Sequence, residues 1–230
     1  MLRSSNVGRL SGVEADNAHD GYRVDSRLRR LLRGGAEGNE RLTGLTGTVL
    51  LVLLAAEGAT IPFLHSYLTL HIFLGVLLIP PVLLKTGATG WRFVRYYRRV
   101  RAYREKGPPP AFLRILVAPL VVASTAALFG TGVLLLVLSP RHGLLVGLHK
   151  ASFIVWFVVM SAHVLGHVVE VPTLTRRAFD RALPGARARQ FLVASALVVG
   201  VIAALATLPL AYHWTNWAAQ HHHHGLPGRV

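Results

Sequence analysis

This chain of 230 residues contains no cysteine and carries a formal net charge of +15 at pH 7. Without cysteine it can form no disulfide, iron–sulfur cluster, thiolate zinc site or covalently attached c-type haem. Hydrophobic residues make up 52% of the sequence and are gathered in long blocks, which indicates a multi-span membrane protein rather than a soluble one. Any metal centre must therefore be held by histidine, carboxylate or thioether groups.

Five apolar runs follow a polar, Gly- and Arg-rich arm that covers residues 1–41. Each run is long enough to cross the hydrocarbon layer of a membrane as a helix. We expect the spans at residues 42–64, 67–84, 112–138, 147–171 and 191–212. Residues 213–230 would then form a tail that is rich in histidine. The sequence predicts an all-α integral membrane bundle of five transmembrane helices, preceded by a flexible basic arm.

Lys and Arg fall mainly on alternate connections between these spans. The arm up to Arg41 holds eight, residues 85–106 hold eight and residues 176–189 hold five. The opposite connections hold none at residues 57–66 and only Arg141 between the third and fourth spans. Because basic loops stay on the cytoplasmic side, we expect a multi-pass protein of the cytoplasmic membrane, with its N-terminus inside and its C-terminus outside.

The second span and the loop after it carry two further signals. Pro80 and Pro81 lack a backbone N–H, which predicts a kink or early unwinding near the inner end of the span. The loop at residues 89–110 interleaves arginine with aromatic residues. Such a segment can bind single-stranded nucleic acid, but beside a span it is typical of an amphipathic helix on anionic lipid. We therefore expect the lipid bilayer as its partner and no nucleic acid.

The fourth span carries three histidines, His149, His163 and His167. At about 100° and 1.5 Å per residue, the step from His149 to His163 returns to the same helix face roughly 21 Å away. His167 joins that face one turn later. Ionisable groups within a membrane span are costly, so each histidine is a candidate functional residue. Trp156 lies on nearly the same face, and we expect it to belong to the core.

An outer layer of the bundle offers a partner for His149. His71 enters the second span from the outside, at a similar depth to His149. Haem b in a helical bundle is held by two neutral imidazoles on opposite sides of the iron, with small residues beside them. Gly75, Gly130 and Gly132 lie near the same level. This layer therefore predicts one haem b with His71 and His149 as its axial iron ligands.

The inner layer leaves several alternatives open. His163 could ligate a second haem, with His167 or Lys85 in support, since Lys85 stands fourteen residues after His71. His163 and His167 could instead form a quinone or proton site with Glu170. Their spacing of one turn is also that of zinc ligands. The sequence does not decide among these interpretations.

The pairing of HIFLG in one span with two histidines fourteen residues apart in another resembles the integral-membrane b-type cytochromes. That group includes cytochrome b561, the cytochrome b subunits of hydrogenase and formate dehydrogenase, and ferric reductases. The resemblance implies a four-helix haem-binding core plus one further helix. It also implies one or two haem b groups and electron transfer at or across the membrane, to or from a quinone or a redox partner subunit. The second span has no second histidine, so the number of haems stays open.

Two other classes of function remain. The same histidines could serve a protein that binds or transports divalent metal ions. Alternatively, the chain could be a cofactor-free membrane scaffold whose basic loops bind lipid or a partner. We find no GxSxG or HExxH pattern and no phosphate-binding glycine loop. If the chain takes part in an enzyme, we expect it to be the electron-transfer subunit of an oxidoreductase.

Overall fold

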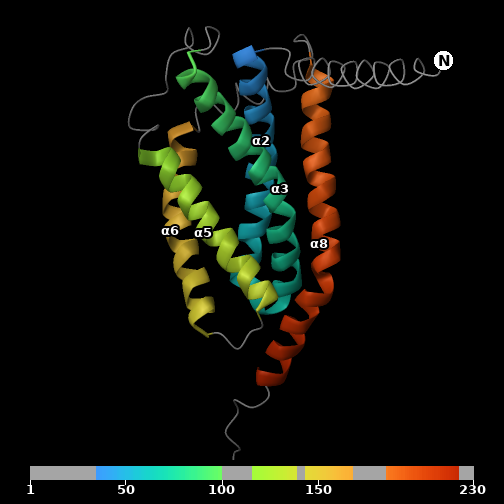
Figure 1. The fold of residues 1–230 in the computed structure, drawn as a ribbon. Coiled ribbons are helices and arrows are strands. Elements are labelled where there is room, and N and C mark those ends of the chain that lie inside the picture. The colour runs from blue at the N-terminus through green and yellow to red at the C-terminus, as the bar shows by residue number, and fades with distance from the viewer. Residues whose placement is uncertain (1–34, 100–115, 139–142, 168–184, 223–230) are drawn as a thin grey trace, which may run out of the picture.

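A computed structural model describes residues 35–99, 116–138, 143–167 and 185–222 (Figure 1). These ranges are helical almost throughout and contain no strand, so the prediction of an all-α chain is confirmed for them. In chain order, the elements are α2 (Gly35–Thr60), the short 3-10 helix η1 (Ile61–Phe63), α3 (Leu64–Tyr97), α5 (Ala118–Val137), α6 (Gly143–His167) and α8 (Ala186–His222).

Four helical segments in the described ranges are long and apolar enough to cross a membrane. They are Ala36–Tyr97, Ala118–Val137, Gly143–Gly166 and Ala186–Tyr212. The first segment has 62 residues and contains both α2 and α3. A multi-pass membrane protein is therefore the class of protein that the structure supports.

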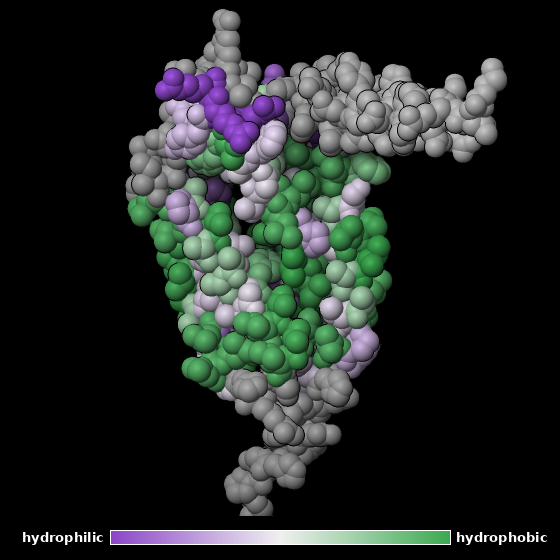
Figure 2. All heavy atoms as spheres, in the orientation of Figure 1, coloured by the Kyte–Doolittle hydropathy of each residue, from purple (hydrophilic) through white to green (hydrophobic). Residues whose placement is uncertain are grey.

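The surface of these helices is apolar over most of its height. Large hydrophobic side chains such as Leu83 (65% exposed), Ile154 (63%) and Val158 (63%) point outward. Figure 2 shows a broad hydrophobic surface on the side in view, with hydrophilic residues gathered at the end of the bundle where α3 ends. In water this exposure would favour aggregation, whereas in a bilayer the same side chains face lipid tails.

α3 is the central element of the bundle. It packs against α2 on one side and α8 on the other, and it also contacts α5. α5 pairs with α6, and successive long helices run in opposite directions (Figure 1). A small apolar core forms where α2 meets α8, built on Leu42, Leu45 and Val193. The bundle therefore consists of a three-helix group, α2, α3 and α8, and the α5–α6 pair.

α3 does not unwind at its prolines, so the unwinding that the sequence offered as one of two alternatives is wrong. The helix runs through Pro80 and Pro81 to Tyr97, and its only non-helical dihedral angles are at Tyr67. Pro81 has no N–H to donate to the carbonyl of Leu77, one turn earlier. Gly200 of α8 lies directly against that carbonyl. A neighbouring helix therefore covers the backbone group that the proline leaves without its usual donor, as is common in membranes.

Several predicted boundaries also differ from the structure. α2 begins at Gly35 rather than at 42, and α3 continues to Tyr97, so the first part of the basic loop is no separate interfacial helix. α8 continues to His222, so the first residues of the predicted tail are helical. Residues 1–34, 100–115, 168–184 and 223–230 lie outside the described ranges, and so do the predictions made for them.

Candidate functional site

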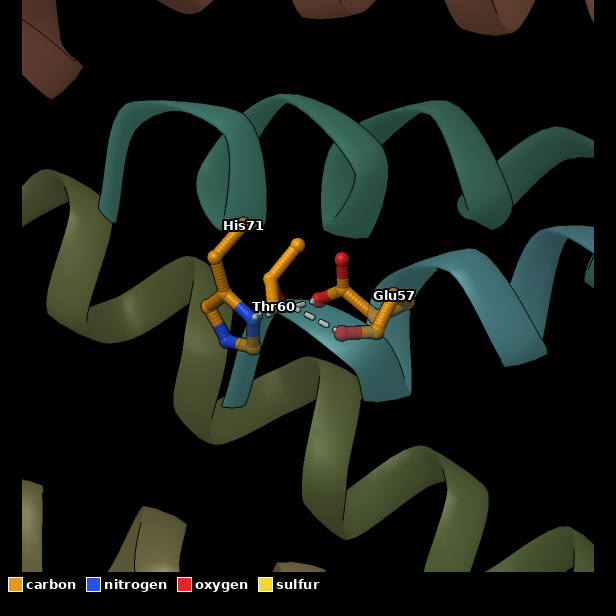
Figure 3. Close-up of polar contacts among 3 residues, drawn as sticks. All are labelled: Glu57, Thr60 and His71. Carbon is orange, nitrogen blue, oxygen red and sulfur yellow. Dashed lines mark hydrogen bonds and ion pairs between the residues drawn. The ribbon is translucent and has the colours of Figure 1, made fainter. Parts of the chain in front are cut away.

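Glu57, Thr60 and His71 form a polar cluster where α2 turns back into α3 (Figure 3). Glu57 and His71 each lie seven residues from Leu64, the first residue of α3, so the helical hairpin brings them to the same level. The Nδ1 atom of His71 is 3.0 Å from the Thr60 Oγ1 and 3.0 Å from a carboxylate oxygen, Oε1, of Glu57. Thr60 is buried, and the other two side chains are mostly buried.

The hydrogen bond that the Thr60 hydroxyl donates indicates which ring nitrogen of His71 carries a proton. The Thr60 hydroxyl has a single proton, which it donates to the backbone carbonyl of Glu57 at 2.6 Å. Thr60 Oγ1 and Glu57 Oε1 can therefore only accept from the ring, so Nδ1 carries the proton. In a neutral ring the lone pair is then on Nε2. Among the described residues, nothing hydrogen-bonds to that atom.

His149 of α6 is held in the same way by hydroxyl groups. Its Nδ1 is 3.0 Å from the Oγ1 of Thr131 on α5. The Thr131 hydroxyl donates back to the Ala127 carbonyl at 2.8 Å, and the Ser152 hydroxyl donates to the His149 carbonyl at 2.9 Å. With its proton on the backbone carbonyl of Ala127 or Leu128, Thr131 accepts from the ring, and we infer that Nδ1 of His149 is also the protonated nitrogen. The backbone of Leu128, on α5, also hydrogen-bonds to the His149 ring.

The fold brings these two histidines near each other from different helices. His71 and His149 are close enough to interact electrostatically. The helix that carries Thr131, α5, packs against α6 and also contacts α3. The two clusters therefore combine side chains of four helices, α2, α3, α5 and α6. Their role as iron ligands stays a prediction.

The three predicted glycines lie in different surroundings. A Cβ added to Gly132 would lie 3.2 Å from Cε1 of the His149 ring, so this glycine makes room for the imidazole. A Cβ added to Gly75 would lie 3.5 Å from the Oε1 of Glu57. Gly130 has no other group within 4 Å of that position. Two of the three glycines thus adjoin the clusters, and the third faces open space.

The inner histidines are less well defined. His163 is partly buried on α6, and the side chain of His167 lies outside the described part of the structure. Lys85, the predicted supporting ligand, donates from Nζ to the backbone carbonyl of Thr43 on α2 at 2.6 Å. Its ammonium group lies over Gly47, where a Cβ would meet it. Lys85 therefore already has a partner on α2, and an inner centre at His163 stays a prediction.

Sequence reasoning missed the polar residues that surround the two histidines. Glu57, Thr60, Thr131 and Ser152 were not predicted as site residues, although Glu57 is an acid in the middle of an apolar run. The available signal for a contact was the spacing, since an ionisable residue lies seven positions before the turn and a histidine lies seven positions after it. Trp156 is buried and donates to Thr125 Oγ1 at 3.0 Å, which confirms the prediction that it belongs to the core.

Within the described ranges, no group of three or more His, Cys, Asp or Glu side chains is arranged to hold a metal ion. Axial ligation of a haem requires only two. Comparison with protein-family models, curated proteins and solved structures gives no match for this chain. Function is therefore inferred from the chemistry of the two histidine clusters.

Proposed function

We propose that this protein is a membrane b-type cytochrome in which His71 and His149 hold one haem b by its iron. The observation that carries the proposal is the shared state of the two imidazoles. They come from different helices, they interact electrostatically, and the Nδ1 of each lies 3.0 Å from an oxygen that can accept its hydrogen.

The donor chemistry of the two clusters fits this group. An imidazole that ligates a metal through Nε2 commonly donates its other ring N–H to a carboxylate, carbonyl or water, which fixes the tautomer and the ring orientation. Both histidines meet that condition through oxygen acceptors at 3.0 Å. The Nε2 of His71 has no hydrogen bond in the described ranges that ligation would have to break.

In this proposal the residues of the chain would have three roles. His71 and His149 bind the iron, Thr60 and Thr131 orient the rings, and the apolar side chains of the helices keep water away. Haem b supplies a one-electron redox centre when it is bound. Transfer across the whole membrane would need a second centre near His163, roughly 21 Å from His149 along α6. Either a second haem or a quinone would serve there. The chain would then act as the electron-transfer subunit of an oxidoreductase.

We further propose five membrane crossings, with α2 and α3 crossing separately. At about 1.5 Å per residue, the 26 residues of α2 and the 34 of α3 extend roughly 39 and 51 Å, and each exceeds the roughly 30 Å of hydrocarbon. The two helices pack side by side in opposite directions. Eight of the nine described Lys and Arg residues lie toward the end where α2 begins, and Lys150 is the exception. That end would face the cytoplasm.

The proposal is tested by a reduced-minus-oxidised absorbance spectrum of the protein purified in detergent after expression with added haem precursor. We expect a b-type haem spectrum in the wild type and its loss or marked weakening in His71→Ala and in His149→Ala. His65→Ala is the matched control, because His65 is exposed in the first turn of α3 and holds neither cluster. It should keep the full spectrum.

Two results would overturn the proposal. A wild-type protein without any haem would exclude this class of cytochrome, and metal analysis of that sample would then test the divalent-metal hypothesis. Unchanged haem in both histidine variants would mean that other residues ligate the iron.

A further inference from the structure

The two clusters differ in charge. His71 donates Nδ1–H to a hydroxyl and to a carboxylate, whereas the partners of the His149 ring, the Thr131 hydroxyl and the Leu128 backbone, are both neutral. Figure 3 shows Glu57 and Thr60 on the same side of the His71 ring, both reaching Nδ1. If the two rings bind one iron, its two axial ligands therefore have unequal surroundings.

The carboxylate of Glu57 is itself incompletely satisfied. Its Oε2 atom is buried and has no hydrogen-bond partner among the residues that the structure describes. In the described part of the chain, the only ion-pair partner of Glu57 is His71, whose ring is neutral when Nδ1 donates and Nε2 ligates. A buried carboxylate with no positive partner is costly. A cationic group bound at the far nitrogen of the same ring would offset that cost.

From this asymmetry we propose that Glu57 is a positioning residue that makes His71 the stronger donor of the two axial ligands and lowers the reduction potential of the centre. The inference rests on the proposed function. A carboxylate that accepts Nδ1–H increases the basicity of the ligating nitrogen. Its negative charge, in surroundings of low dielectric constant, favours the oxidised iron over the reduced iron, which carries one positive charge less. Both effects act in the same direction.

A purely structural role for Glu57 makes a different prediction. Glutamine at this position keeps the shape of the side chain and an oxygen that can accept from Nδ1, but it removes the charge. If Glu57 only braces the hairpin between α2 and α3, Glu57→Gln leaves the potential unchanged. If its charge acts through His71, the potential becomes more positive.

The experiment is a spectroelectrochemical titration of the purified, haem-loaded full chain at one fixed pH. We expect a positive shift of the midpoint potential in Glu57→Gln, together with altered g-values of the ferric low-spin electron paramagnetic resonance signal. Glu37→Gln is the matched control, because it makes the same change of charge twenty residues earlier, about 30 Å away along α2. It should leave the potential at the wild-type value.

Two further variants keep the proposal falsifiable if Glu57→Gln loses haem. Thr60→Val removes the neutral acceptor and leaves Nδ1–H to the carboxylate alone, so the potential should stay unchanged or fall. Thr131→Val removes the hydroxyl acceptor of His149 and should shift the potential less than Glu57→Gln. A potential in Glu57→Gln that equals the wild-type value, or a positive shift in Thr60→Val, would overturn the inference. Absence of haem from the wild type would instead contradict the proposed function.

Discussion

Gly132→Ala tests whether the position of the His149 ring matters. Gly132 lies on α5, and an added Cβ would lie 3.2 Å from Cε1 and 3.7 Å from Nδ1 of that ring. The first distance is shorter than most Cβ contacts in proteins, so the imidazole must move by a few tenths of an ångström. A movement of His149 away from Thr131 would lengthen their hydrogen bond, which is 3.0 Å in the structure. The substitution should therefore displace the proposed ligand without removing it.

The size of the effect follows from the cost of overpacking. An added methyl group in a close-packed site costs about 1–3 kcal/mol. Since about 1.4 kcal/mol corresponds to a factor of ten, haem affinity should fall roughly 5- to 150-fold if the cost falls on the bound state. The gain in helix propensity on replacing glycine by alanine, up to about 1 kcal/mol, stabilises the folded chain whether or not haem is bound.

The assay is titration of the haem-free protein in detergent with haem, followed by absorbance. Gly130→Ala is the control, because it lies two residues earlier on α5, makes the same chemical change and meets no other group within 4 Å. We expect Gly130→Ala to bind haem as the wild type does and Gly132→Ala to bind it more weakly. Equal affinities in the two variants would refute the view that the His149 ring must sit where it does.

Three further predictions concern helix packing, membrane topology and the role of Lys85. Gly200→Ala should lower the thermal stability in detergent, by about 1–3 kcal/mol, because its Cβ would collide with the backbone carbonyl of Leu77; an unchanged melting temperature would contradict the packing of α8 on α3. The chain has no cysteine, so an impermeant maleimide should label Ser66→Cys in intact cells but Arg98→Cys only after permeabilisation, and the reverse pattern would invert the topology. Lys85→Met should leave the haem content per chain unchanged, whereas a loss of haem would make that residue a ligand.

The all-helical class followed from the sequence because it depends on composition over long windows. The boundaries of individual helices did not follow from the sequence. α3 passes through Pro80 and Pro81 because packing against α8 outweighs the cost of a proline, and a local pattern contains no information about that neighbour. The prediction of unwinding failed because Gly200, more than a hundred residues away in sequence, approaches the carbonyl of Leu77.

Only part of the candidate site was predictable, because contacts between helices are again not visible in a local pattern. His71 and His149 could be found because histidine is rare in apolar spans, and an estimate of depth sufficed to pair them. The acceptors of the two rings could not be found from the sequence, because threonine is common in membrane helices and Thr60 and Thr131 do not stand out. Their roles depend on which face of a helix meets its neighbour. Ligation itself and any centre at His163 stay predictions.

Electron paramagnetic resonance of the ferric protein at low temperature tests the central claim most directly, because the spin state reports the number of strong axial ligands. The claim predicts a low-spin signal for the wild type with both His71 and His149 bound to iron. It also predicts conversion to a high-spin signal, or loss of haem, in His71→Ala and in His149→Ala. A low-spin signal that is unchanged in both variants would contradict the account.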